Sequence, residues 1–266
     1  MKVSGLNRLL ERISTGRLAL GCQVFDPDTV EMLAFSGIDF IWADMMFGSL
    51  DWSDAREIVR ASKAANVGCL VRAQAEPWIP GSDKRAIADC HRILTLDVTG
   101  AVLSVSSVEE VELLVEVSKD WHRGLHVHPF TKDTYQDYKD QVLAETLSIP
   151  LIEEAELFRN IEQVLDVEGL RAVWLGMSDL SRELGHPFDY EHPDVWAAVD
   201  RTVDLARSRG IVVVANVGWE SPSVDAQIER ILRLSDHGVG MVSMQHIVQP
   251  IYQHIIGTAR ARSERS

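Results

Sequence analysis

Short apolar runs alternate with longer amphipathic stretches along the whole chain. The apolar runs are rich in β-branched residues, whereas the stretches between them place apolar residues at helical spacing. We predict eight strands, at residues 18–24, 39–44, 67–73, 101–106, 149–155, 172–178, 211–218 and 238–245. Eight strands that alternate with helices are typical of a (β/α)8 TIM barrel, a fold of the α/β class.

Two of the intervening stretches carry helix boundary signals. The stretch 26–37 begins with a capping candidate, Asp26, and ends at Gly37, and the stretch 192–210 ends at Gly210. Both are predicted to be helices of the barrel.

No linker or break in composition divides the chain, and its length suits one barrel. Residues 124–130 could form a further strand, but the polar helical run that follows at 132–147 favours a long loop there. We therefore expect a single domain over residues 1–260, followed by a short basic tail, 261–266, that frays.

The acidic composition excludes several classes of partner. The formal net charge is −14 and the pI is near 5.0, so the field of the protein repels nucleic-acid phosphates and anionic membranes. The amino-terminal residues lack the apolar core of a signal peptide, and no run is long enough to span a membrane, so we expect a cytoplasmic protein. The three cysteines form no CxxC pair and are expected to be buried thiols.

Polar residues near the carboxyl ends of the predicted strands are the candidates for the working site. In parallel barrels the ligand binds at this end, because loops and helix amino termini converge there. The candidates are Gln23, Asp44, Arg72, Glu153, Glu154, Ser178, Asp179, Asn216, Trp219, Gln245 and His246.

Glu153 and Asp179 lie at the ends of two successive predicted strands, so their carboxylates are expected to meet across one strand spacing. Two hard oxygen ligands with open positions suit Mg²⁺ or Mn²⁺, with Co²⁺ as a third option. The alternative is that Glu153 is a solvated loop residue and that Asp179 caps the helical turn that follows it. From spacing alone, both interpretations stay open.

Arg72 ends an otherwise apolar strand, where a guanidinium needs an anionic partner. A substrate carboxylate held by two hydrogen bonds is one such partner. A structural salt bridge to Asp44 or to a neighbouring carboxylate is the other.

A rival metal site involves His126 and His128, which would face the same side of a strand and could bind Zn²⁺ together. Barrel hydrolases with two metals use such a pair, but in them the pair closes the first strand and further histidines follow at later strand ends. Here the pair lies mid-chain, so a zinc hydrolase is a distant alternative.

The segment from Ile152 to Gly185, IEEAELFRNIEQVLDVEGLRAVWLGMSDLSRELG, resembles the HpcH/HpaI family of metal-dependent aldolases, which act on pyruvate-type 2-oxo acids. It is similar to the family's glutamate strand, DVEG turn and GxxDLS segment, including the spacing from Glu153 to Asp179. The resemblance spans most of the chain. It implies a homo-oligomer, because family members pair helices across subunits.

The resemblance also implies roles for four residues. Glu153 and Asp179 would bind the metal, Arg72 would hold the oxo acid and steady the enolate oxygen, and Asp44 would belong to the acid/base group.

Three positions depart from the family pattern. Phe47 replaces the basic His that usually follows the second strand, Leu151 replaces a glutamine, and Met177 replaces the proline of GPxDLS. Because a phenyl ring cannot transfer a proton, the usual base is missing, while the metal ligands are intact. Phe47, Leu151, Met177 and Ser178 are expected to contact the substrate.

The sequence therefore predicts a metal-dependent carbon-carbon lyase that acts on a small 2-oxo acid through a metal-stabilised enolate. Without the basic His, the same scaffold could instead decarboxylate an oxaloacetate-like acid or catalyse a condensation. A barrel that binds metal and oxo acid without turnover is an alternative of another class.

Overall fold

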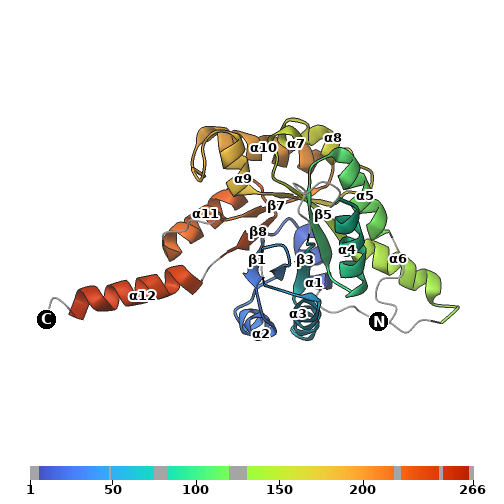
Figure 1. Cartoon of the computed structure of the whole chain (residues 1–266), viewed down its shortest axis with the longest axis horizontal. Helices are drawn as coiled ribbons and strands as arrows, with labels where there is room; N and C mark the ends of the chain where they lie inside the picture. Colours follow the sequence, from blue (N-terminus) through green and yellow to red (C-terminus); the bar gives the residue numbers. More distant parts are fainter. Residues whose placement is uncertain are drawn as a thin grey trace.

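The structure, a computed structural model, describes residues 6–47, 49–74, 83–119, 131–218, 223–245 and 248–263. Its strands form one closed parallel barrel in sequence order, in which β8 pairs with β1 (Figure 1). The strands are β1 Ala19–Val24, β2 Phe40–Asp44, β3 Gly68–Arg72, β4 Gly100–Val105, β5 Leu147–Ile152, β6 Ala172–Leu175, β7 Val212–Asn216 and β8 Met241–Met244. The predicted (β/α)8 TIM barrel is confirmed.

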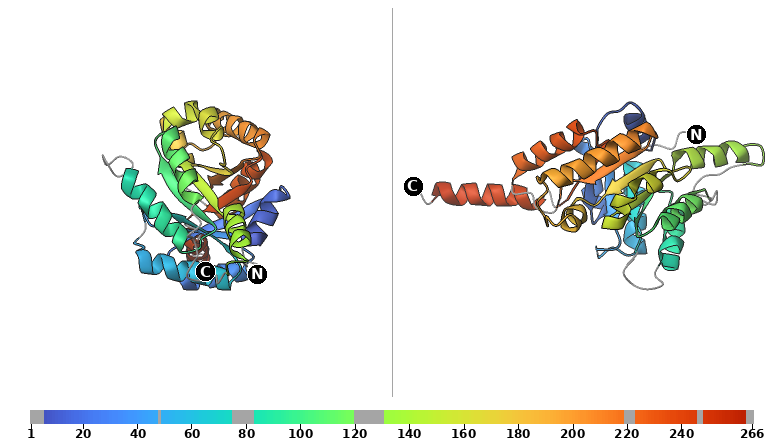
Figure 2. Two further views of the ribbon diagram at one scale, coloured as in Figure 1. Left: turned by 90° about the vertical axis from the view of Figure 1, so that its right-hand side faces the viewer. Right: turned by 90° about the horizontal axis from the view of Figure 1, so that it is seen from above.

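Helices surround the barrel (Figures 1 and 2). They are α1 Leu6–Ser14, α2 Pro27–Phe35, α3 Trp52–Ala64, α4 Asp83–Thr95, α5 Val108–Ser118, α6 Tyr135–Glu145, α7 Ala155–Arg159, α8 Ile161–Leu165, α9 Met177–Glu183, α10 Pro193–Ser208, α11 Val224–Asp236 and α12 Val248–Ser263. The side chain of Asp26 accepts a hydrogen bond of 2.7 Å from Thr29 N, which confirms the predicted start of α2. The polar run at 132–147 contains α6, whereas residues 124–130 lie outside the described residues.

All eight predicted strands are present, and β5 and β6 differ most from the prediction at their carboxyl ends, since each ends three residues early. β5 ends at Ile152 and β6 at Leu175, because the short helices α7 and α9 begin almost at once. Glu153 therefore lies between β5 and α7, and Asp179 lies in the first turn of α9. The prediction that both residues mark the carboxyl ends of β5 and β6 agrees with this placement.

The core consists of two layers separated by the barrel wall. Successive side chains of a strand point to opposite faces, so one buried cluster fills the barrel and another lies between strands and helices. Inside the barrel, the rings of Trp42 and Trp174 are in contact, with centroids 4.9 Å apart. In the outer layer, burial raises the pKa of Cys22 and Cys69 to about 12, which confirms the interpretation of these cysteines as buried thiols.

The last helix, α12, runs away from the barrel (Figures 1 and 2). It continues to Ser263, so the predicted frayed tail is helical over residues 261–263, and residues 264–266 lie outside the described part. Within the described ranges, no helix is long and apolar enough to cross a membrane.

Candidate active site

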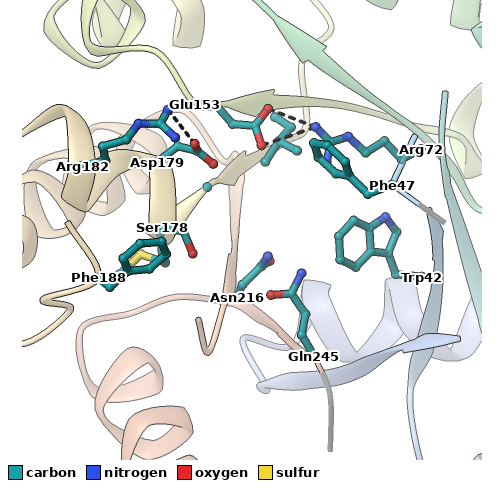
Figure 3. A pocket seen from close by; sticks show the side chains of 13 residues that line it. Trp42, Phe47, Arg72, Glu153, Ser178, Asp179, Arg182, Phe188, Asn216 and Gln245 are labelled. Atoms are coloured by element: carbon teal, nitrogen blue, oxygen red, sulfur yellow. Dashed lines mark hydrogen bonds and ion pairs between the residues drawn. The ribbon is translucent and has the colours of Figure 1, made fainter. Parts of the chain in front are cut away.

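A pocket of about 410 Å³ opens at the carboxyl ends of the strands (Figure 3). Segments far apart in the sequence line it, and the structure brings most of the predicted site residues together there. The lining residues are Trp42, Phe47, Arg72, Leu151, Glu153, Gly176, Met177, Ser178, Asp179, Arg182, Phe188, Asn216 and Gln245. Asp44 does not line the pocket but lies behind it, in an ion pair with Arg72.

Glu153 is the most constrained carboxylate of the pocket. Its side chain is 21% exposed, and its Oε2 atom lies 3.0 Å from Nη2 of Arg72. Burial raises the pKa of the Glu153 carboxyl, and the positive charge of Arg72 opposes this rise only in part. The interpretation of Glu153 as a solvated loop residue is therefore wrong.

A glycine allows Glu153 to occupy this position. A Cβ atom added to Gly176 would lie 2.8 Å from Cγ of Glu153, closer than real carbon atoms approach. A glycine here lets β6 pass close to the end of β5, so the carboxylate can face the pocket.

Asp179 is the second carboxylate, and it lies in the first turn of α9. The residue that precedes this helix is Gly176, so the interpretation of Asp179 as an N-cap is wrong. Its Oδ1 atom lies 2.7 Å from Nη2 of Arg182. After burial, the largest cause, the negative charge of Asp179 also raises the pKa of the Glu153 carboxyl.

Arg72 lies at the end of β3 and is 3% exposed. It is the centre of a buried charge network, because it pairs with Glu153 and, at 3.6 Å, with Asp44, and it donates a hydrogen bond to Ser104. The structural salt bridge considered from the sequence is therefore present. The Nε atom of Arg72 is buried without a hydrogen-bond partner among the described residues, which leaves a donor for an added anion.

The turn after β2 places Phe47 at the edge of the pocket. Asp44 holds this turn, because its Oδ1 atom accepts hydrogen bonds from the backbone N–H groups of Met46, at 2.9 Å, and Phe47, at 3.4 Å. The ring of Phe47 is 59% exposed and packs against the guanidinium of Arg72, 5.1 Å from its centroid. Among the described residues, this edge of the pocket has a carboxylate that organises the backbone but no imidazole.

The wall near α9 combines apolar side chains with one hydroxyl. Leu151, Met177, Phe188 and Ser178 line the pocket (Figure 3). The Ser178 hydroxyl is 2.9 Å from the Tyr190 hydroxyl. The apolar character predicted from Leu151 and Met177 is therefore present, and Phe188 adds to it.

The floor of the pocket carries buried polar atoms. Nε1 of Trp42 and Oε1 of Gln245 have no hydrogen-bond partner in the part of the chain that the structure describes. Asn216 accepts a hydrogen bond from Trp174 Nε1, so its amide nitrogen remains for a ligand. A ligand with hydroxyl or carbonyl groups could satisfy these atoms, because an unpaired buried polar group is costly.

Some pocket residues were predicted and others were missed. Asn216 and Gln245 were among the strand-end candidates, whereas Arg182 and Phe188 lie beyond the strands and carry no periodic signal. Trp42 both packs against Trp174 and lines the pocket. The remaining candidates on the far loops lie outside the described residues: His126, His128, Trp219 and His246.

Comparison with known sequences identifies relatives of this barrel. The sequence model of the HpcH/HpaI aldolase/citrate lyase family matches residues 20–246. A hydroxypyruvate/pyruvate aldolase from Paraburkholderia phytofirmans is 28% identical over 187 residues, which cover 68% of this chain and 71% of that protein.

Comparison with solved structures gives the same fold. The crystal structure of an HpcH/HpaI aldolase from Desulfitobacterium hafniense has a TM-score of 0.76 at 21% identity, and the match covers 96% of each chain. Protein CitE from Mycobacterium tuberculosis, solved in complex with magnesium and pyruvate, has a TM-score of 0.53 at 15% identity and covers 88% of this chain and 87% of that chain.

Proposed function

This chain belongs to the HpcH/HpaI aldolase/citrate lyase family and is a carbon-carbon lyase, and on that premise we propose that it acts on a small 2-oxo acid with a divalent metal held by Glu153 and Asp179. The observation that carries the proposal is that these two carboxylates and Arg72 line one pocket. The related CitE, solved with magnesium and pyruvate, supports it.

The carboxylate pair fits a hard divalent cation. Three carboxyl groups, those of Asp44, Glu153 and Asp179, pair with only two arginines, Arg72 and Arg182, so a cation would balance the remaining negative charge. Oxygen ligands with room for water and substrate suit Mg²⁺ or Mn²⁺, with Co²⁺ as a third option. Such an ion would polarise the 2-oxo group and stabilise the enolate as a Lewis acid.

The protein's own residues bind and orient the acid. Arg72 supplies a fixed guanidinium, held by Asp44 and Ser104, that can bind the substrate and stabilise negative charge on its oxygen. Ser178 offers a hydroxyl beside Asp179. Leu151 and Met177 exclude water from this side, which strengthens these polar interactions.

Phe47 decides which reactions remain open. Aldol cleavage needs a base that takes a proton from a hydroxyl group. The phenyl ring of Phe47 cannot act as this base. The carboxylate of Asp44 is already engaged by a backbone N–H group and by Arg72. Decarboxylation of an oxaloacetate-like acid releases CO₂ without such a base, so Phe47 favours it as a second candidate. Condensation with proton transfer by water is the other alternative.

Turnover measurements test the proposal. With Mg²⁺ or Mn²⁺, we expect either loss of oxaloacetate or exchange of the pyruvate methyl protons in deuterium oxide, and chelation by EDTA should stop both. Arg159→Ala, a surface change outside the pocket, serves as the control. A protein that binds pyruvate with metal but is inert in both assays would contradict the lyase proposal and support a binding protein.

We also propose that the chain forms a homo-oligomer through α12. Because β8 pairs with β1, a helix that follows β8 is expected between α11 and α2, yet α12 runs away from this place (Figure 1). The three helices expose large apolar side chains: Met32 and Phe35 on α2, Ile228 and Leu232 on α11, and Ile251, Tyr252, Ile255 and Ile256 on α12. A second copy's α12 would cover this surface, because apolar patches of this kind mark interfaces.

Sedimentation of the full chain tests this proposal. We expect an oligomer that Ile251→Asp with Ile255→Asp converts to monomers. Leu113→Asp, which changes an equally exposed apolar residue on α5, should leave the oligomer intact. A monomeric native chain would contradict the proposal.

A further inference from the structure

The loop between α9 and α10 holds a second group of metal-ligating side chains, outside the pocket. Within the described ranges, His186, His192 and Asp194 are the one group of three potential ligands whose ligand atoms all lie within 4.8 Å of one another. Two imidazoles and one carboxylate form a donor set that differs from the oxygen donors of the pocket. We propose that this cluster is a Zn²⁺ site that fixes the loop forming one wall of the pocket.

The distances between the ligand atoms suit the ion. Oδ2 of Asp194 lies 3.2 Å from Nε2 of His186 and 3.7 Å from Nδ1 of His192. Two atoms bound to a tetrahedral Zn²⁺ at its usual bond lengths are about 3.4 Å apart. Nδ1 of His192 accepts a hydrogen bond of 3.2 Å from Asp194 N, and the ion would replace this backbone donor at the same lone pair when the ring turns.

The backbone sets these positions in advance. His186 N donates to Ser181 O at 2.8 Å, Asp189 N donates to His186 O at 3.0 Å, and His192 N donates to Asp189 O at 3.3 Å. The two histidines are thus connected through Asp189. Their rings are stacked with centroids 3.3 Å apart, and binding requires the rings to turn so that both lone pairs point at the ion. The side chains are 29% and 30% exposed, which leaves room for this rotation.

The donor set selects the ion. Imidazole nitrogen suits Zn²⁺, whereas Mg²⁺ and Mn²⁺ prefer carboxylate oxygen and water. A net charge of −14 raises the local concentration of any cation. With three protein ligands and water in the fourth position, the site is tetrahedral.

The loop connects the ion to the pocket. Phe188, which lines the pocket (Figure 3), and Tyr190, whose hydroxyl bonds Ser178, lie between the two histidines in the sequence. Phe188 has a positive φ of 61°, a strained conformation that its surroundings must hold. An ion that connects His186 to His192 closes the loop around these two residues and holds the pocket wall in place.

Zinc titration by calorimetry tests the site. The reference protein carries Glu153→Gln and Asp179→Asn, so that the pocket carboxylates do not contribute. We expect one Zn²⁺ to bind per chain. His186→Ala or His192→Asn should weaken its affinity at least ~10-fold, because removing even a residue that only orients a metal ligand lowers metal affinity by this factor. His192→Asn preserves the cap of α10, because Asn is a preferred N-cap residue.

The control is His237→Ala, which removes a histidine that pairs with one carboxylate, Asp200, and has no third ligand. It should bind Zn²⁺ as the reference does. Amide hydrogen exchange over 186–192 should slow on adding Zn²⁺ and should not slow in His186→Ala. The proposal is overturned if the reference binds no Zn²⁺, or if its affinity survives in both folded histidine variants.

Discussion

The two sides of the pocket differ in how their functional residues are held. On the β5–β6 side, Glu153 and Asp179 stand at the junction of strands and helices, fixed by Gly176 and by ion pairs to Arg72 and Arg182. On the β2 side, Phe47 stands on an exposed turn whose backbone is held by Asp44.

This difference indicates on which side of the pocket a residue can be replaced with little loss of folding stability. A change at Glu153 would leave Arg72 with one carboxylate fewer in a buried network, and such a loss is expensive. Phe47 is largely exposed, so its identity affects the barrel little and the reaction strongly. We therefore expect substitutions on the β5–β6 side to reduce stability, and substitutions on the β2 side to change which reaction or substrate is favoured.

The largest expected effect is on the β5–β6 side. Glu153→Gln or Asp179→Asn should lower metal-dependent turnover by more than ~100-fold, because a Lewis-acid metal contributes several kcal/mol. Folding should persist, since both residues lie at the rim of the barrel. Calorimetric titration with Mn²⁺ checks this, and undiminished metal affinity in both variants would remove the carboxylate site.

Arg72→Lys should have the next largest effect. Lysine keeps the charge but loses the planar fork that contacts Asp44, Glu153 and the acid together, so kcat/KM should fall by about 10- to 100-fold. The matched control is Arg182→Lys, since the Arg182 side chain is exposed where it pairs with Asp179 and Glu183, and its change should lower kcat/KM less. A fully active Arg72→Lys protein would restrict Arg72 to a structural role.

A pH titration of metal affinity sharpens the comparison. A metal needs the ionised carboxylate, and burial raises the pKa of Glu153, so affinity is complete above this raised pKa and is lost as the pH falls through it. We expect the metal affinity to be lost at a higher pH than it would be for a glutamate with the usual pKa of 4.5. Mn²⁺ binding measured from pH 4 to 8, roughly the span over which carboxyls and imidazoles titrate, checks this. A loss at the ordinary value would contradict the effect of burial.

The smallest effect is expected on the β2 side. Phe47→His should place an imidazole near Asp44 and raise pyruvate proton exchange, while the native reaction falls. The gain should stay below ~10-fold, less than a well-positioned base provides, because Leu151 and Met177 leave the pocket apolar. If exchange equals that of the native protein with metal bound, then residue 47 is not at the proton-transfer position.

The sequence predicted the barrel and much of the pocket for physical reasons. Apolar runs at strand spacing identify the strands, and their carboxyl ends meet at one face, so Arg72, Glu153 and Gln245 could be ranked without a structure. Phe188 and Arg182 could not be ranked, because a loop and a short helix bring them back over the strand ends. The direction of α12 could not be predicted either, since its apolar residues do not specify which surface they cover.

The pair of tryptophans beneath the pocket has an optical consequence. Trp42 lines the pocket and contacts Trp174. A ligand that displaces water from the pocket would therefore change the polarity around the indole of Trp42. It would also change the transfer of excitation energy between Trp42 and Trp174. The protein therefore carries its own fluorophore at the binding site, and oxo-acid binding should alter its emission. Trp42→Phe should remove most of that change, whereas Trp52→Phe, on α3 and outside the pocket, should preserve it.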